Sequence, residues 1–246
     1  MYYATQNSPI VIINITRALL VAMEHTPGSY HLPFAAKEVE MLQDRFRKMG
    51  LHSIQPKPYK QDIILHLAEC RIFHFAGHGY TDPANPSKSQ LILKDGKDDL
   101  LTNSPFLAYL SACGTGRIKD ERFINKRFQH VIGTLWSVND ETCVDMAKVI
   151  YRELGNRQVN NKSVCQGLHQ AAREMRDCWI HTSLVSIHPS KPFWNASEHQ
   201  EDRQLDSMEL GGTAGLPRDI VSTETDMDGE KGATEAFWVP YVHFGV

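Results

Sequence analysis

The chain has 246 residues, of which 41% are hydrophobic, so it is long enough to bury a sizeable core without staples. This excludes the small disulfide scaffolds. Twenty-six Lys and Arg residues against 29 Asp and Glu give a net charge of −3 and a pI near 6.4. No global basic field is therefore present to recruit nucleic acid or an anionic membrane.

The cysteines and the N-terminal segment indicate the compartment. The five cysteines are an odd number without a CxxC pair, which is typical of reduced thiols in a reducing compartment. The apolar run from Ile10 to Met23 is only 14 residues long, is broken by Asn14 and Arg17, and follows a start without the basic region of a signal peptide. We therefore expect a cytoplasmic protein with no membrane partner.

In the N-terminal half, the apolar pattern predicts strands and helices in alternation. Two short runs within Ile10 to Met23, IVIINI and ALLVAM, each have the composition of a buried strand. Helical spacing predicts a helix over 34–49, with Gly50 placed to end it in the left-handed region. A short helix over 61–69 then leads into a strand over 71–76.

The C-terminal half continues this alternation. Strands are predicted over 106–112 and 131–138, and Asn139-Asp140 offers a cap for a following helix. A second helix is predicted over 163–179 and a last strand over 237–246. Continuous apolar strands interleaved with helices indicate an α/β fold with a mostly parallel central sheet, flanked by helices on both faces.

The segment from 182 to 234 breaks the pattern. It holds ten acidic and four basic residues, scattered Gly and Pro, and little apolar periodicity. We therefore predict a single domain over 1–246 in which 182–234 is an acidic, disordered insertion before the last strand.

Three predicted strands end in residues that can carry chemistry, and ligands collect at the carboxyl ends of parallel strands. His78 follows the first between two glycines, Cys113 follows the second before Gly-Thr-Gly, and Asp140 follows the third after Trp136. A thiol beside an imidazole suffices for acyl transfer. The glycines permit close approach of a substrate, so that the N–H groups of Gly79 and Cys113 can point at an oxyanion.

Other readings of these residues stay open. A cysteine that ends a buried strand is commonly a small core residue, and Asp140 is also well placed to cap a helix. His74 lies about 13 Å from His78 along a strand, too far for one metal ion, and is read as a packed strand residue. Because HExxH, GxxxxGK[ST] and GxGxxG are missing from the sequence, we expect no metal and no cofactor.

The motifs HFAGHG (74–79), LSACGTG (110–116) and VIGTLWSVND (131–140) together resemble the CHAT domain, a caspase-like domain associated with tetratricopeptide repeats, and the fungal members look most similar. The resemblance implies a caspase-hemoglobinase sheet and a His78/Cys113 dyad that cleaves a partner protein. It also implies that the chain can be the effector part of a longer protein with tetratricopeptide repeats. In similar peptidases such as separase, the acid at the position of Asp140 lies in the pocket for the residue before the scissile bond, which implies cleavage after a basic residue.

Two alternatives remain at this stage. The connections before and after the Cys113 strand are short for the family, which keeps open a catalytically inactive CHAT-type interaction or regulatory domain. The same alternation of strands and helices also allows a flavodoxin-like domain, although the phosphate-binding glycines which that fold uses at its first turn are missing here.

Overall fold

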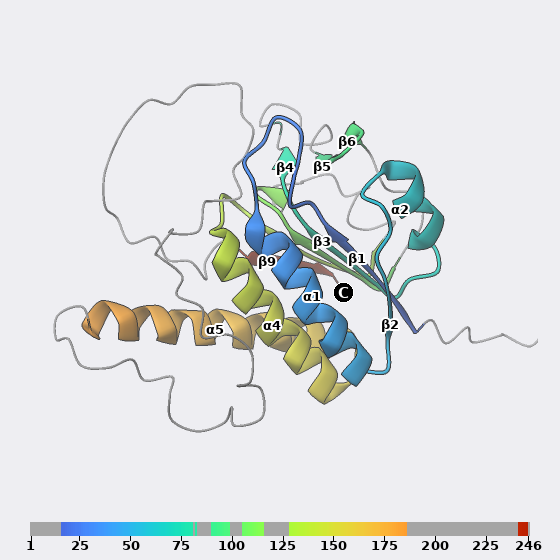
Figure 1. Ribbon diagram of the computed structural model, residues 1–246. Coiled ribbons are helices and arrows are strands. Elements are labelled where there is room, and N and C mark those ends of the chain that lie inside the picture. Colours follow the sequence, from blue (N-terminus) through green and yellow to red (C-terminus); the bar gives the residue numbers. More distant parts are fainter. Residues whose placement is uncertain are drawn as a thin grey trace, which may run out of the picture.

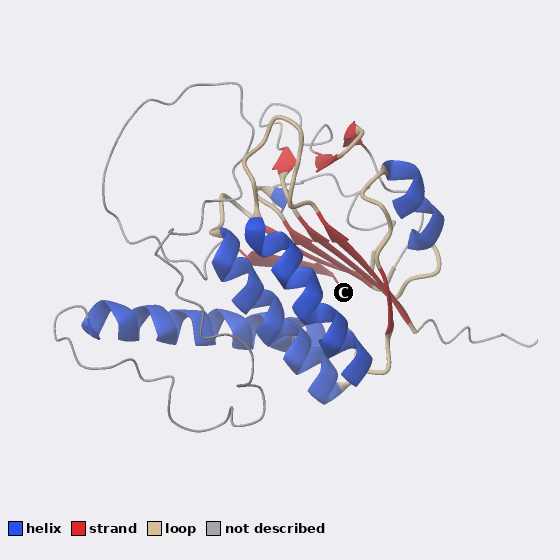
Figure 2. Ribbon diagram, viewed as in Figure 1, coloured by secondary structure: helices blue, strands red, loops and turns tan. Residues whose placement is uncertain are grey.

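A computed structural model describes residues 16–80, 82, 90–98, 105–115, 128–185 and 241–245 (Figures 1 and 2). The central sheet has six strands: β1 (Arg17–Ala22), β2 (His52–Ile54), β3 (Ile72–Ala76), β7 (Leu107–Ser111), β8 (His130–Thr134) and β9 (Tyr241–Gly245). A smaller sheet has three: β4 (Gly79–Tyr80), β5 (Gln90–Leu93) and β6 (Gly96–Asp98). The described helices are α1 (Pro33–Lys48), α2 (Lys60–Leu67), α4 (Asp140–Arg157) and α5 (Asn161–Val185).

The central sheet is mostly parallel, as the sequence predicted. Its order is β2-β1-β3-β7-β8-β9, and only the β8–β9 pair among these neighbours is antiparallel. In this order β3 and β7 are neighbours, although about 30 residues lie between them along the chain. Residues at the carboxyl ends of these two strands therefore share one edge of the sheet.

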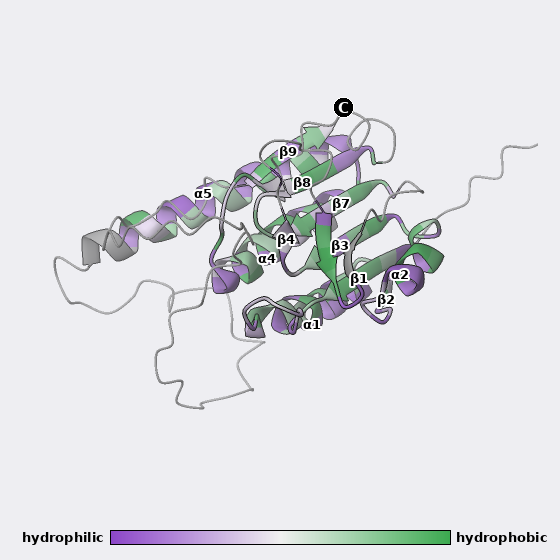
Figure 3. Ribbon diagram, turned by 90° about the horizontal axis from the view of Figure 1, so that it is seen from above, coloured by the Kyte–Doolittle hydropathy of each residue, from purple (hydrophilic) through white to green (hydrophobic). Residues whose placement is uncertain are grey.

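Helices cover both faces of this sheet (Figure 1). Alternate strand residues point to opposite faces, so that Leu20 joins the cluster formed with α1, α4 and α5, whereas Leu19 joins the cluster formed with α2. Helix α4 packs against both α1 and α5. Figure 3 shows the hydropathy of these elements: the strands of the central sheet are mostly apolar, whereas the helices carry both apolar and polar residues.

Most predicted elements are confirmed within a few residues. The helix expected over 34–49 is α1, and Gly50 after it has a φ of 71°. Of the two N-terminal runs, ALLVAM contributes to β1, and IVIINI lies outside the described residues. The strand expected over 131–138 is shorter than predicted, because the chain turns after Thr134, whose hydroxyl donates to the carbonyl of Ala112 on the neighbouring segment.

The acidic segment 182–234 falls almost wholly outside the described residues. Its first four residues, 182–185, continue α5, which is longer than the helix predicted over 163–179. The strand expected over 237–246 is present as β9. The short strands β2, β4, β5 and β6 were not predicted, since two to four residues carry too little periodicity. No described helix is long and apolar enough to cross a membrane.

Candidate active site

The structure brings the segments of His78 and Cys113 together at the carboxyl edge of the central sheet. Ala76 at the end of β3 is in register with Ser111 at the end of β7, and each candidate residue follows two positions later. The N–H of Gly77 donates to the carbonyl of Ser111 at 3.1 Å. A Cβ atom built on Gly79 would lie 2.6 Å from the carbonyl oxygen of Cys113, so the backbone segments at Gly79 and Cys113 are in direct contact.

The hydrogen bond of His78 fixes which of its ring nitrogens can act as a base. Its Nε2 lies 2.8 Å from the carbonyl oxygen of Tyr30, in the loop between β1 and α1. Because a carbonyl only accepts, Nε2 carries the proton and donates it. Nδ1 is buried and has no hydrogen-bond partner among the residues that the structure describes. In the neutral ring this nitrogen holds the lone pair that can accept a proton.

The turn that carries Cys113 is held in place by two threonines. Gly114 has a φ of 69°, the left-handed conformation that glycine adopts at little cost. The Thr115 hydroxyl donates to the carbonyl of Ala112 at 2.9 Å and accepts from the N–H of Thr134 at 3.1 Å. The same hydroxyl lies 3.2 Å from the carbonyl oxygen of Leu110 on β7. The turn is therefore bonded both to β7 and to β8, which restricts the position of the Cys113 backbone.

Asp140 is fully buried and serves a helix other than the one it begins. Its Oδ2 accepts from the N–H of Phe34 at 2.9 Å, in the first turn of α1. This supplies a cap that Leu32, at the N-cap position of α1, does not provide. The side chain of Asn139 caps α4 instead, accepting from the N–H of Thr142 at 3.1 Å.

Trp136 also lies at this edge of the sheet, in the connection between β8 and α4. It follows the last residue of β8 by two positions, and 37% of its surface is exposed. An indole in this place can offer an apolar face to a ligand.

A buried polar network lies below the site, between the sheet and α1. His74 is confirmed as a packed strand residue: its Nε2 lies 3.1 Å from Oε1 of Glu38, and its Nδ1 lies 3.1 Å from the hydroxyl of Tyr151. The Ser111 hydroxyl donates to Oε2 of the same glutamate at 3.2 Å. Glu38 thus connects the two strands that lead to His78 and Cys113.

Sequence reasoning missed several of these contacts. The carbonyl of Tyr30 leaves no signature, because every residue has one. Glu38 did leave a signal, since it falls in line with Leu42 and Phe46 on the apolar side of its helix. A charged residue at such a position is expected to have a buried partner.

The other cysteines differ from Cys113 in their surroundings. Burial raises the pKa of the Cys70 thiol to about 11, which makes it a poor nucleophile at neutral pH. Cys143 is fully buried and accepts from the hydroxyl of Tyr241 at 3.2 Å. Cys165 is exposed, with its Sγ 3.6 Å from Nδ1 of His243.

A mostly parallel α/β sheet that carries a histidine and a cysteine on neighbouring strands is the arrangement of caspase-like proteins. The sequence model of the CHAT domain matches residues 4–245. The chain therefore belongs to the CHAT domain family, and its α/β fold is caspase-like, as the three motifs implied.

Among solved structures, the chain is distantly similar to two cysteine proteinase structures. The Arg-specific cysteine proteinase gingipain R aligns over 65% of this chain with 12% identity and a TM-score of 0.44. The complex of the pro- and mature domains of RgpB from Porphyromonas gingivalis aligns over 64% with 13% identity and a TM-score of 0.43. In each case the matched part is 42% of the other chain. No curated protein matches this chain.

Proposed function

We propose that this chain is a caspase-like cysteine endopeptidase in which Cys113 is the nucleophile and His78 is the acid and base. The orientation of the imidazole carries the proposal. The Tyr30 carbonyl holds Nε2–H and leaves Nδ1 as a buried base, one residue before the glycine that touches Cys113. Nδ1 is thereby the ring nitrogen that can take a proton from a neighbouring thiol.

In the proposed mechanism His78 carries a proton from the thiol to the leaving amine, and the acyl group is transferred to the sulfur of Cys113. Nδ1 of His78 takes the proton from the Cys113 thiol, and the sulfur adds to the scissile carbonyl carbon. The C–N bond then breaks as Nδ1–H protonates the leaving amine, which leaves an acyl-enzyme thioester. Water, deprotonated by the same nitrogen, releases the carboxylic acid and the thiol. The Tyr30 carbonyl stabilises the imidazolium, because it accepts from Nε2–H throughout.

The backbone and the exposed indole complete the proposed site. The N–H groups of Gly79 and Cys113 are the candidate donors to the oxyanion, and their chains lie in contact. Trp136 is the candidate contact for the substrate chain, because it is exposed at the same edge of the sheet. The proposed substrate is a protein or peptide.

One observation favours the alternative, a catalytically inactive domain that binds or regulates a partner. His78 and Cys113 are both fully buried, so a peptide reaches the sulfur only after the residues that bury it rearrange. The peptidase proposal therefore includes an opening step, whereas an interaction domain needs none.

Reaction with a peptidyl electrophile distinguishes the two. We expect a peptidyl acyloxymethyl ketone to modify Cys113 faster than the other four cysteines, since the site binds the peptide and the imidazole activates the thiol. His78→Gln is expected to slow this reaction by roughly a hundredfold, the lower end of what general base catalysis contributes. Mass spectrometry of tryptic peptides measures the rate at each cysteine.

Two cysteines serve as internal controls for this measurement. Cys143 is buried as completely as Cys113, so burial alone predicts equal and slow rates for both. Cys165 is exposed, so its rate shows how fast a thiol reacts with the peptidyl electrophile without a binding site. For each cysteine, the rate is divided by its rate with iodoacetamide, which corrects for differences in accessibility. Equal corrected rates at Cys113 and Cys143, unchanged in His78→Gln, would leave the inactive domain as the function.

We further propose that cleavage follows a basic residue, with Asp140 as the determinant. A carboxylate favours Lys or Arg in the adjoining pocket, and a bidentate contact favours Arg. Since Oδ2 of Asp140 already accepts from Phe34, this role requires that the oxygens be divided between α1 and the substrate.

Asp140→Asn tests this division, because the amide oxygen can still accept from Phe34 while the charge is lost. We expect the wild-type protein to prefer Arg before the scissile bond in a peptide library, and the variant to lose most of that preference with little change in melting temperature. An unchanged preference together with a lower melting temperature would make Asp140 a cap of α1 only.

We also propose that the protein acts in the cytoplasm and that this chain is part of a longer protein with tetratricopeptide repeats.

A further inference from the structure

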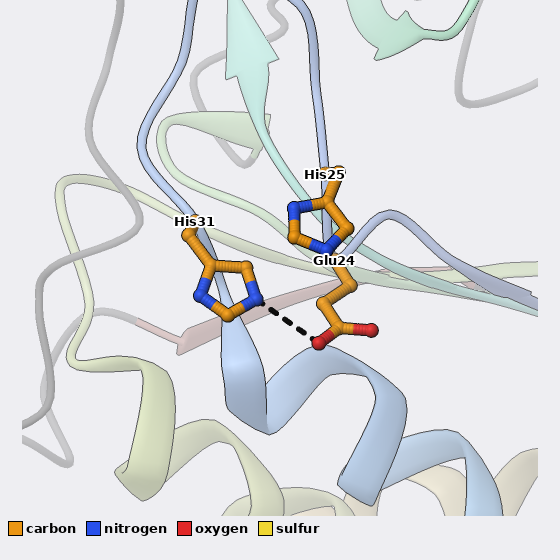
Figure 4. A group of neighbouring side chains, drawn as sticks. All are labelled: Glu24, His25 and His31. Carbon is orange, nitrogen blue, oxygen red and sulfur yellow. Dashed lines mark hydrogen bonds and ion pairs between the residues drawn. The ribbon is translucent and has the colours of Figure 1, made fainter.

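A second cluster of reactive side chains lies in the loop between β1 and α1. Glu24, His25 and His31 each offer one ligand atom, and these atoms lie within 4.8 Å of one another (Figure 4). Nε2 of His31 is 3.0 Å from Oε1 of Glu24, and the two imidazole rings stack with centroids 4.4 Å apart. Within the described part of the chain, this is the group that meets the geometry of three convergent metal ligands.

The backbone of the loop holds these three residues together. The N–H of Leu32 donates to the carbonyl of Glu24 at 3.0 Å, which ties the two arms of the loop at its base. The N–H of Met23 donates to the carbonyl of Ala76 at 2.8 Å, which fastens the first arm to the end of β3. The ligands therefore come from both arms of a closed loop, and their approach does not depend on the side chains alone.

We propose that Glu24, His25 and His31 bind a zinc ion. Two imidazole nitrogens and a carboxylate oxygen are a common ligand set for zinc, with a water in the fourth position. In a tetrahedral zinc site the ligand atoms are about 3.3 Å apart, so the pairs that now lie at up to 4.8 Å must close by somewhat more than an ångström. Rotation of the partly exposed side chains supplies this movement, and the ring stacking is lost in exchange for the metal bonds.

The sequence predicts no metal, because the common zinc motifs have fixed local spacings. His25 and His31 are six residues apart, which matches none of these motifs, and a turn at Gly28 brings the two residues together. The convergence is a property of the loop and not of the spacing.

The same loop also holds the imidazole of His78. Tyr30, whose carbonyl accepts from Nε2–H of His78, is the residue before the proposed ligand His31. A zinc ion that fixes His31 also fixes this carbonyl. If the proposed peptidase function holds, on which this step rests, zinc binding sets the orientation of the base and thereby regulates the reactivity of Cys113.

Other cysteines and histidines of the chain can also bind zinc, so a test of the loop cluster must distinguish their binding from that of Glu24, His25 and His31. His243 lies between His130 and Cys165, with Nε2 facing the first at 2.9 Å and Nδ1 facing the second at 3.6 Å. Since one imidazole cannot direct both nitrogens at one ion, these three do not converge as the loop cluster does. The thiol of Cys113 is the other competing ligand.

Calorimetric titration of the full chain with zinc chloride tests the proposal directly. The protein carries Cys113→Ala, which removes the competing thiol and makes the result independent of any peptidase activity. We expect one zinc per chain, with affinity reduced roughly tenfold or more by either His31→Ala or Glu24→Gln. His52→Ala, at an exposed histidine on β2, is the matched control and should bind zinc as before.

The other outcomes decide against the site. No binding, or binding lost in Cys165→Ser and retained in His31→Ala, would overturn the proposal. The regulatory step is read separately in the wild-type chain, where zinc should change the labelling rate of Cys113 and lose that effect in His31→Ala. Zinc binding without any preferential labelling of Cys113 would retain the metal site and reject the peptidase.

Discussion

Gly79→Ala is expected to abolish the preferential reaction of Cys113 with a peptidyl electrophile and to lower the stability of the fold. The added Cβ would lie 2.6 Å from the carbonyl oxygen of Cys113 and 3.3 Å from Cγ2 of Thr115. A backbone oxygen cannot rotate away from this contact. The turn must therefore move, although its threonine hydrogen bonds hold it to both β7 and β8.

The expected size follows from overpacking of a rigid site. Such contacts cost about 1–3 kcal/mol in the free energy of unfolding, which urea denaturation measures. Gly155→Ala is the matched control, because its Cβ would meet only the side chain of Met49, with Cγ at 3.0 Å and the sulfur at 3.5 Å, and alanine favours the helix. If Gly79→Ala unfolds like the wild type and still labels at Cys113, then the close approach of β4 does not position the cysteine.

The fold was predictable because its strands and helices have clear apolar patterns. The α1 helix, with Gly50 after it, is specified locally by spacing and by one conformational need. The strands β3 and β7 are entirely buried, and runs of apolar residues reveal such strands without knowledge of their neighbours. What the runs do not give is the order of the strands, which decides that His78 and Cys113 share an edge.

The candidate site was predictable only in its side chains. His78 and Cys113 stand out because glycines surround them at strand ends, whereas the groups that hold them are backbone atoms and distant hydroxyls. The carbonyl of Tyr30 lies 48 positions before His78 and has no residue preference. The sequence predicts Asp140 either as a substrate-pocket residue or as a cap of the helix that it begins, yet its Oδ2 accepts from the N–H of Phe34 in α1, 106 positions away. Long-range hydrogen bonds of this kind depend on the completed packing.

The buried network around Glu38 gives the second large effect. We expect Glu38→Ala to lower the free energy of unfolding by about 3–5 kcal/mol, because it removes the buried carboxylate that pairs with His74 and accepts from Ser111. In a chain of this length the melting temperature should fall by on the order of 10 °C. Glu40→Ala, two residues later on the exposed side of α1, should change stability by less than about 0.5 kcal/mol.

The physical cause is the uncompensated polar group and not the lost contact area. Burial, together with the nearby Glu38 carboxylate, raises the pKa of Tyr151 well above its usual value, so its hydroxyl stays protonated and can donate to Nδ1 of His74. This leaves Nε2 of the same ring to face Oε1 of Glu38, 3.1 Å away. Replacing both partners, as Glu38→Leu with His74→Phe, should recover much of the stability that Glu38→Ala loses, since apolar side chains of similar size need no hydrogen bonds. A double variant no more stable than Glu38→Ala would instead assign the loss to Tyr151 and Ser111, the remaining members of the network.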